Sequence, residues 1–412
     1  MPLVKVSSKV SRARWLGWSA FLAPNFFSTN RQVENISISN VTRNNILSVL
    51  IPAFIIVILF FQSKRVPQKF GKSHAYLVLF LIWASCSSFW SDNFSISFAK
   101  SITLILQFML SYMLVSQYSD IKEFFKDFSH FIQVLSILIM ANLTVNFKES
   151  YALEKSGVKR LVEGTLHISS NTLATIFAIS LIIVFFGTDE MKVFKTKFIN
   201  TFLLGFYCIF LILTKSRLTI LFTLSIIVLI ILINRQLALN FRILFLISLV
   251  SILVVVYLSF FNFIIEFFTR SQNSISISTL SGRTNIWDQA LSLWNESPWI
   301  GHGYYVGHRF NIREILGSRT EVSNLDNIWI ESLIDVGFIG FLILFVFMVK
   351  TFKRLTKLLL LAEPGERYAI FGVGILLLIS TTFNPSIQIA CFQGGIFSAL
   401  LLSGIGFNNR PN

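Results

Sequence analysis

The sequence predicts an all-α integral membrane protein, a bundle of about twelve transmembrane helices with one large loop outside the membrane. Of the 412 residues, 54% are hydrophobic and only 13% are charged, and the mean hydropathy is +0.70. Soluble domains carry about 25% charged residues, so this chain has too little polar surface to cover several globular cores. Apolar runs long enough to cross a bilayer as helices recur along the chain. The alternating pattern typical of a membrane β-barrel is absent.

The twelve predicted spans are apolar along their whole length and are separated by charged residues. The first is short and contains Pro24, whereas the others follow the usual pattern. In chain order they are Trp15–Phe27, Asn45–Phe61, Ala75–Trp90, Phe98–Val115, Phe128–Leu143, Thr172–Phe186, Phe198–Thr214, Leu218–Ile233, Ile243–Phe261, Ile328–Val349, Tyr368–Thr382 and Ile387–Ile405. No repeat or low-complexity linker divides residues 1–412, which we expect to form one integral membrane domain.

The net charge of +15 follows largely from the predicted membrane topology. With the N-terminus inside, most Lys and Arg residues fall in short cytoplasmic connections, as the positive-inside rule requires. Both termini are therefore predicted to be cytoplasmic. The basic composition does not require a nucleic-acid partner.

Two outer segments are long, residues 146–171 and residues 262–327. The second is too long for a simple connection. Within it, Ile286, Trp287, Ala290, Leu291 and Trp294 recur at helical spacing, which predicts an amphipathic helix over 283–294. Such a helix either lies on the outer membrane surface or packs over the mouth of the bundle, and the pattern alone does not choose between them.

Cations in outer connections oppose the orientation signal of the rest of the chain. Lys215 and Arg217 lie in one short outer connection, and Arg160 lies in the 146–171 loop. Because a guanidinium binds phosphate oxygens through two parallel hydrogen bonds, a shared anionic ligand would explain these cations. Pairing with nearby glutamates or lipid headgroups is the alternative.

The span that begins near residue 328 carries acidic side chains. Asn327, Glu331 and Asp335 recur at intervals of four residues on one helix face, and Asp326 lies at the membrane edge. Ionisable groups at such depth face a bundle interior or a wet cavity. We expect Asp326 to take part in chemistry and Asp335 to form an ion pair, with Arg217 or Arg283 as the expected cation.

No metal site is predicted. His302 and His308 are six residues apart, and no carboxylates stand near them at metal-ligand spacing.

Several short motifs, ordered along the chain, resemble those of the O-antigen ligase and O-antigen polymerase superfamily of bacterial inner-membrane proteins. No single motif is specific, but five in order are. They are Trp90–Ser91–Asp92, Glu163–Gly164 through Ser170–Asn171, Lys215–Ser216–Arg217, Ser281–Gly282–Arg283 with Trp287, Pro298, Gly301 and Gly303, and Asp326–Asn327 with Gly337 and Gly340.

The resemblance implies a membrane glycosyltransferase without a cofactor, whose donor is a glycan on undecaprenyl pyrophosphate at the periplasmic face. Family ligases have His where this chain has Asp326, and an ordinary Asp is a weaker base by roughly 2.6 pKa units. This departure favours a repeat-unit polymerase for O-antigen or exopolysaccharide. A ligase that attaches glycan to lipid A core is the alternative, and a polysaccharide transporter or flippase is the competing class.

The same resemblance implies roles for individual residues. Arg217 and Arg283 would hold the leaving pyrophosphate, and Asp326 would activate the acceptor hydroxyl. The substrate-binding residues would be Arg160, Asn171, Lys215, Asn327 and Glu331. The partners would be the lipid-linked donor, the glycan acceptor, membrane lipids and other polysaccharide assembly proteins, with no nucleic acid.

Overall fold

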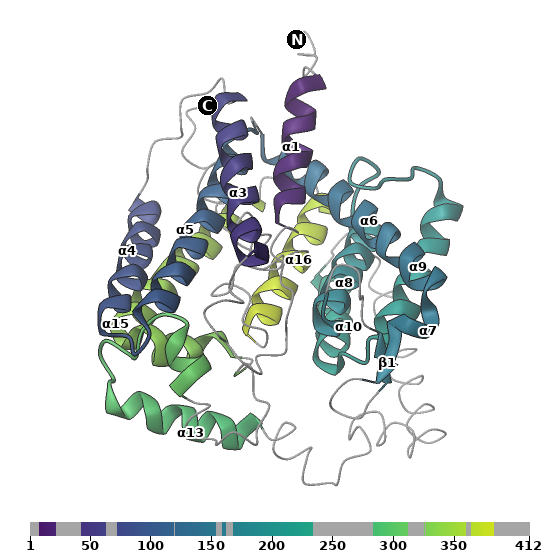
Figure 1. The fold of residues 1–412 in the computed structure, drawn as a ribbon. Helices are drawn as coiled ribbons and strands as arrows, with labels where there is room; N and C mark the ends of the chain where they lie inside the picture. The colour runs from purple at the N-terminus through teal and green to yellow at the C-terminus, as the bar shows by residue number, and fades with distance from the viewer. Residues whose placement is uncertain are drawn as a thin grey trace.

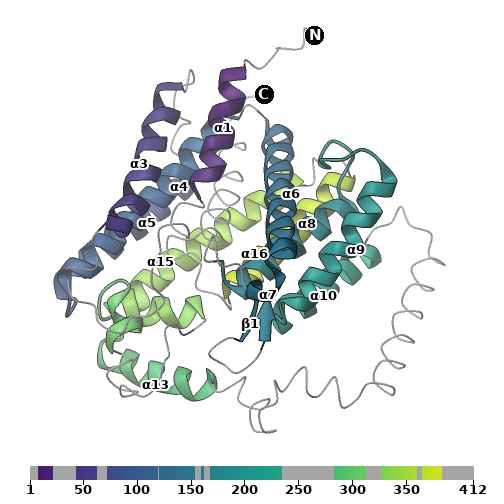
Figure 2. The same cartoon turned by 45° about the vertical axis from the view of Figure 1, so that its right-hand side comes forward.

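The computed structural model describes residues 8–21, 43–62, 72–118, 120–153, 159–161, 168–233, 283–311, 325, 327–359 and 364–382. Within these ranges the chain is helical apart from one two-stranded hairpin. The long helices run roughly alongside one another as a bundle (Figures 1 and 2). In order, the elements are α1 Ser8–Ala20, α3 Arg43–Gln62, α4 Lys72–Cys86, the 3₁₀ turn η2 Ser87–Trp90, α5 Phe94–Ser116, α6 Ile121–Val145, α7 Phe147–Ser150, β1 Tyr151–Leu153, β2 Lys159–Leu161, α8 Ser170–Phe186, α9 Lys197–Leu213, α10 Arg217–Ile233, α13 Arg283–Glu296, the π-helical turn η3 Gly307–Asn311, α15 Ile328–Leu359 and α16 Pro364–Thr382.

Three helices are long and apolar enough to cross a membrane: Phe94–Ser116, Ile121–Val145 and Ile328–Arg354. Shorter apolar helices accompany them, among them Ser170–Phe186 and Arg217–Ile233. Helices cover the described parts of the predicted spans. Ile243–Phe261, Ile387–Ile405 and residues 22–27 of the first span lie outside the described residues. The predicted helical class is therefore confirmed for the described residues, and the set of apolar helices is that of a multi-pass membrane protein.

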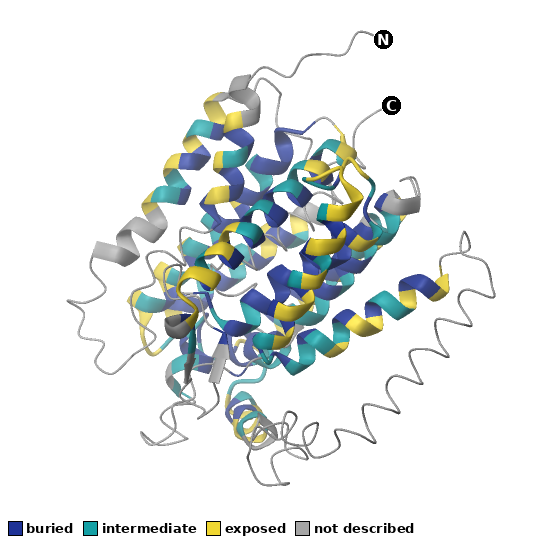
Figure 3. Cartoon of the chain, turned by 90° about the vertical axis from the view of Figure 1, so that its right-hand side faces the viewer, coloured by how far each residue is buried: buried dark blue, intermediate teal, exposed yellow. Residues whose placement is uncertain are grey.

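Large apolar side chains point outward from the bundle. Phe61 is 81% exposed and Phe198 is 80% exposed, and exposed residues follow the outer faces of the helices in Figure 3. Exposed apolar surface of this extent is unfavourable in water but is satisfied by lipid. α8 lies at the centre of its half of the bundle, and from Leu173 to Val184 every residue is buried.

The first predicted span was wrong in its bounds, because the helix runs from Ser8 to Ala20 and residues 22–27 lie outside the described part. Arg14, expected in a cytoplasmic flank, is inside this helix and is only 5% exposed. Its guanidinium pairs with Glu123 of α6 at 2.5 Å and donates to the Gln117 carbonyl at 2.9 Å. A buried cation is tolerated where it is paired in this way.

Contacts between elements show which connecting segments lie at the same end of the bundle. Arg14 joins the start of α1 to the α5–α6 connection, and Lys122 of α6 lies 3.9 Å from Glu366 of α16. At the other end lie α13 and the β1–β2 hairpin (Figures 1 and 2).

The helix predicted over 283–294 is α13, and its apolar face packs on the protein. Ala290 and Leu293 are buried, and the Trp287 indole N–H donates to the Leu325 carbonyl at 2.8 Å. Leu291 stays 36% exposed. The described side chains thus place α13 against the start of α15.

Candidate active site

Three segments that are far apart in the sequence meet at the α13 end of the bundle. They are η2 with the residues after it, the stretch 298–311, and the first turns of α15. Hydrogen bonds join the first two: Tyr304 N to Ser87 Oγ (2.9 Å), Trp90 Nε1 to Ile300 O (3.2 Å) and Asn311 Nδ2 to Asp92 Oδ2 (2.7 Å). The motifs around Trp90, Pro298 and Gly337 thus form one local structure.

α15 is broken at Gly337, whose φ is 67° and ψ −175°. Such a break leaves helix N–H and C=O groups without their usual partners. The 298–303 stretch supplies the missing ones. Phe338 N donates to Pro298 O (2.8 Å), Ile339 N to Trp299 O (3.3 Å), His302 N to Ile334 O (2.8 Å) and Gly303 N to Asp335 O (2.9 Å). The indole N–H of Trp83 donates to the Val336 carbonyl at 2.9 Å.

Glycine is required on both sides of this junction. Gly337 has backbone angles that are essentially restricted to glycine, and Gly301 has φ 70°. A Cβ on Gly301 would lie 2.5 Å from Gly337 N, and a Cβ on Gly337 would overlap the Trp299 carbonyl. The two glycines therefore let two backbones touch where a side chain would separate them.

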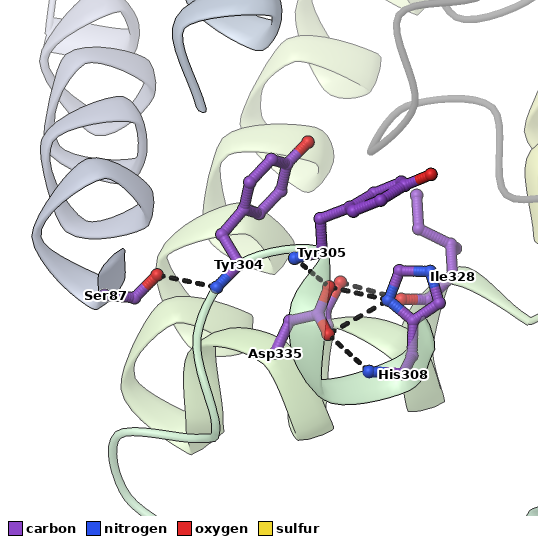
Figure 4. Close-up of polar contacts among 7 residues, drawn as sticks. Ser87, Tyr304, Tyr305, His308, Ile328 and Asp335 are labelled. Atoms are coloured by element: carbon purple, nitrogen blue, oxygen red, sulfur yellow. Dashed lines mark hydrogen bonds and ion pairs between the residues drawn. The ribbon is translucent and has the colours of Figure 1, made fainter. Parts of the chain in front are cut away.

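Directly beside the break, Asp335 forms a buried ion pair with His308 (Figure 4). The His308 Nδ1–H donates to Asp335 Oδ2 at 2.8 Å, and both side chains are 0% exposed. The backbone N–H groups of Tyr305 and His308 also donate to this carboxylate, at 2.8 Å and 2.9 Å. One aspartate thus holds the turn that precedes and includes η3.

Burial alone would lower the pKa of His308, but the Asp335 and Glu331 carboxylates outweigh that effect and raise it. The other ring nitrogen of His308, Nε2, has no hydrogen-bond partner among the described residues. The sequence predicted an ion pair for Asp335 and named an arginine as partner. The pair that the structure provides is with His308.

Two cations flank the ring of Tyr305. The Lys100 ammonium lies 4.9 Å from the ring centroid, and the Arg309 guanidinium carbon lies 5.3 Å from it. Burial would raise the pKa of Tyr305, but Arg309, Lys100 and His308 together lower it. Lys100 comes from α5 and Arg309 from η3, so only the folded chain brings both cations to the Tyr305 ring.

The two predicted residues at the start of α15 have clear structural surroundings. Asn327 caps the helix, because its Oδ1 accepts from the backbone N–H groups of Trp329 (3.0 Å) and Ile330 (3.3 Å). Glu331 is fully buried one turn later. Its negative charge acts on His308, so Glu331 and Asp335 belong to one charged cluster.

Lys215 and Arg217 lie at the tight turn between α9 and α10. Lys215 has φ 49°, an uncommon conformation for a residue with a side chain. The buried Ser216 between them donates to Asn171 Oδ1 of α8 at 3.1 Å. Arg217 is the first residue of α10. The fold thus brings Asn171 to the turn that carries both predicted cations.

The other predicted residues are only partly described. Arg160 is in β2, opposite Ala152 of β1, and β2 lies against α9. Arg283 is the first residue of α13. The side chains of both arginines, and the whole of Asp326, lie outside the described residues.

No motif or spacing predicted the cluster of Lys100, Tyr305, His308 and Arg309. Lys100 looked like one more cation near a span end, and His308 stands 27 residues before its partner Asp335. Spacing could not reveal either contact. The signal available in the sequence was the crowding of Gly, Tyr, His and Arg over 301–309, which is unusual for a connection that only links two spans.

Residues 201–345 match a protein family described as O-antigen ligase. Exopolysaccharide production protein ExoQ of Rhizobium meliloti (strain 1021) is 35% identical to this chain over 111 residues. That match covers 25% of this chain and 25% of the relative, so it spans about a quarter of the relative's length. The matched family segment contains the α9–α10 turn, α13 and the first part of α15, including the break at Gly337. The resemblance inferred from the motifs is thereby confirmed over residues 201–345, which match the O-antigen ligase family.

Proposed function

We propose that this protein is a membrane glycosyltransferase that polymerises undecaprenyl-pyrophosphate-linked oligosaccharide repeat units for O-antigen or exopolysaccharide. The observation that carries the proposal is the junction at Gly337, where the Trp90, Pro298 and α15 motifs meet within reach of buried charges. The O-antigen ligase match over residues 201–345 supports the same class of reaction.

In the proposed reaction, the bond between the donor sugar C1 and the pyrophosphate oxygen breaks. The acceptor hydroxyl oxygen forms the new glycosidic bond, and the lipid pyrophosphate leaves. Arg217 and Arg283 stabilise the negative charge that develops on the leaving group, because fixed cations act most strongly where charge appears in the transition state. Arg160 and Lys215 assist in holding the same anion, and Asn171 orients the turn through Ser216.

The acceptor hydroxyl must lose a proton as it attacks. We assign Asp326 as the group that takes this proton, next to the helix start that Asn327 caps. Exclusion of water by bound substrates would make this carboxylate a stronger base, since desolvation disfavours its charged form. Glu331 contributes negative charge that keeps the neighbouring cations in place.

A polymerase is favoured over a ligase by two features. Asp326 stands where family ligases have histidine, and the named relative is an exopolysaccharide production protein. A ligase would use lipid A core as acceptor, whereas a polymerase uses another lipid-linked glycan.

A transporter is the competing class, and the break in α15 is the observation that favours it. Discontinuous helices often line substrate pathways in transporters, usually in corresponding positions of two halves. Among the described helices, only α15 has non-helical angles inside it. The break is closed by the 298–303 backbone, which fits a rigid junction better than a moving gate.

The proposed location is the bacterial inner membrane, with about twelve spans and both termini cytoplasmic. The 146–171 and 262–327 loops would then lie in the periplasm with the active site, in one domain over residues 1–412. The end of the bundle that carries α13 and β1 is the periplasmic end in this proposal.

Deletion of the gene followed by gel profiling of surface glycan tests the proposal. Loss of polymer with single repeats retained is the expected result. Lipid-linked polymer that is never attached would indicate a ligase, and an unchanged glycan profile would exclude both enzymes.

A further inference from the structure

We propose that Lys100 and Arg309, on the ring of Tyr305, form a second anion-binding subsite that takes the phosphate groups of a lipid headgroup. This inference rests on the proposed function, and it concerns residues outside the predicted Arg217 and Arg283 set. The ligand class is a lipid-linked pyrophosphate, a diester while it carries its glycan and a monoester once it is free.

The first support is the local excess of positive charge. Lys100 and Arg309 share one aromatic ring at 4.9 Å and 5.3 Å. In the ranges that the structure describes, no carboxylate lies within 4.0 Å of either cation, and the buried Nε of Arg309 has no hydrogen-bond partner. Two adjacent cations repel each other unless an anion lies near both.

The neighbouring carboxylates have other partners. Asp92 accepts from Asn311 at 2.7 Å, and Asp335 accepts from His308 and from two backbone N–H groups. These contacts fix the chain from Tyr305 to Asn311. The cluster is thus built on a rigid base while its two cations remain available to an external anion, which is how preorganised sites gain affinity.

The second support is position. Lys100 lies near the start of α5, at the end of the bundle where η2 and η3 meet. Arg217 starts α10, and α5 and α10 lie on opposite sides of α16 in both views (Figures 1 and 2). The Tyr305 cluster is therefore a different place from the α9–α10 turn.

A second phosphate subsite has a specific use in a polymerase. Donor and acceptor are both glycans on lipid pyrophosphate, so two lipid pyrophosphates must be held at once, whereas a ligase holds only one. We assign the α9–α10 turn to the donor headgroup and the Tyr305 cluster to the acceptor headgroup. Arginine and lysine together suit this task, since a guanidinium adds directional hydrogen bonds to the point charge of an ammonium.

The test is direct binding to the purified full-length protein in nanodiscs, with native mass spectrometry for stoichiometry and titration for affinity. Two probes are used separately, undecaprenyl pyrophosphate in the nanodisc and inorganic pyrophosphate in solution. The test variant is Lys100→Gln with Arg309→Gln. The matched control is Lys350→Gln, because Lys350 lies 4.1 Å over the Tyr76 ring at the C-terminal part of α15.

The wild-type protein and Lys350→Gln should bind two lipid pyrophosphates. The double variant should bind one, with the second affinity weakened at least tenfold, as expected for lost charge-assisted hydrogen bonds. Weaker binding of both probes by the double variant supports a lipid headgroup subsite. Loss with inorganic pyrophosphate alone supports the same cations as a site for free pyrophosphate and overturns the acceptor assignment.

Unchanged binding of both probes by the double variant, with the same thermal stability as the control, would overturn the proposal. A second double variant, Lys100→Arg with Arg309→Lys, separates loss of the subsite from unfolding. It keeps both positive charges and should still bind the second lipid pyrophosphate. Binding is measured without turnover, so the two proposals fail in different ways. The subsite proposal fails if the double variant still binds two lipid pyrophosphates, whereas the proposed function fails if the wild-type protein forms no polymer.

Discussion

The Asp335 carboxylate and the His308 ring form an ion pair with 2.8 Å between Oδ2 and Nδ1, completely buried beside the break in α15. The pair links η3 to the first half of the broken helix, and the 298–303 backbone links to both halves. Charge and backbone contacts thus hold one junction together at the proposed active end of the protein.

Replacing Asp335 by Asn should destabilise the protein by about 3–5 kcal/mol, the range seen when one partner of a buried ion pair is removed. The imidazolium of His308 would lose its nearest counter-charge, and the two backbone donors would face a weaker acceptor. Denaturant unfolding in detergent micelles measures the change. The control is Asp189→Asn, because Asp189 is an 80% exposed partner of Lys192 and should cost at most about 1 kcal/mol. Equal stability of the two variants would contradict the role given to the pair.

The pH dependence of stability follows from the same pair. Because the pKa of His308 is raised above its ordinary value of 6.5, the pair contributes its full stability below pH 6.5. That contribution is lost as the pH rises through the folded-state pKa. Wild-type protein should therefore lose stability relative to His308→Gln as pH increases from 6 upward, measured by unfolding at fixed salt. A difference between the two proteins that does not change with pH would show that folding leaves the pKa of His308 unshifted, and a difference that moves the other way would show that folding lowers it. Glu331, Arg309 and Tyr305 also face this ring, so the comparison uses the difference between the two proteins and not either curve alone.

Substitution of Gly337 by Ala should disrupt the junction. The backbone angles cost roughly 1–3 kcal/mol for a residue with a side chain, and the new Cβ would overlap the Trp299 carbonyl. We expect a lower thermal midpoint and loss of polymer in cells. Gly205→Ala in α9 is the control, since nothing lies within 4 Å of a Cβ at that position. Wild-type polymer and stability in Gly337→Ala would show that the break is not needed.

Much of the helical framework was predictable from the sequence, because all-round apolar runs between charged residues have few other structures available in a bilayer. The break at Gly337 was not, since glycine occurs in unbroken membrane helices as well. The apolar stripe of α13 predicted a helix but not its partner, because Trp287 and Ala290 could pack equally well on α15 or on a membrane surface.

The candidate site was likewise predictable only in part. Lys215 and Arg217 stood out because they oppose the charge pattern of the other connections. His308 and Lys100 acquire their surroundings only from contacts between distant segments, and the partner of Asp335 depended on how the 298–311 stretch folds back onto α15.

The contact between Asn171 and Ser216 should matter for activity more than for folding. Asn171→Ala and Ser216→Ala both remove the hydrogen bond between these two side chains, worth about 1 kcal/mol. Ser216→Ala also removes the 3.0 Å contact of its hydroxyl with Thr219 Oγ1. Each variant should lower polymer formation several-fold, and the double variant should be no worse than the poorer single one, because both changes release the same turn. Ser225→Ala on the exposed face of α10 is the control, since that hydroxyl only bonds the Leu221 carbonyl. Additive losses would contradict a shared role in positioning Arg217.

The central claim is that cations at this end of the protein promote release of lipid pyrophosphate during polymerisation. The most direct measurement uses purified protein in lipid vesicles with a defined repeat unit on undecaprenyl pyrophosphate, and follows chain length on gels together with released lipid pyrophosphate. Wild-type protein should give a ladder of chain lengths with one lipid pyrophosphate released per bond formed. Arg217→Lys and Arg283→Lys should insert normally and lose most of this activity, because an ammonium cannot replace the two parallel hydrogen bonds of a guanidinium. A full ladder from both variants would contradict the assignment.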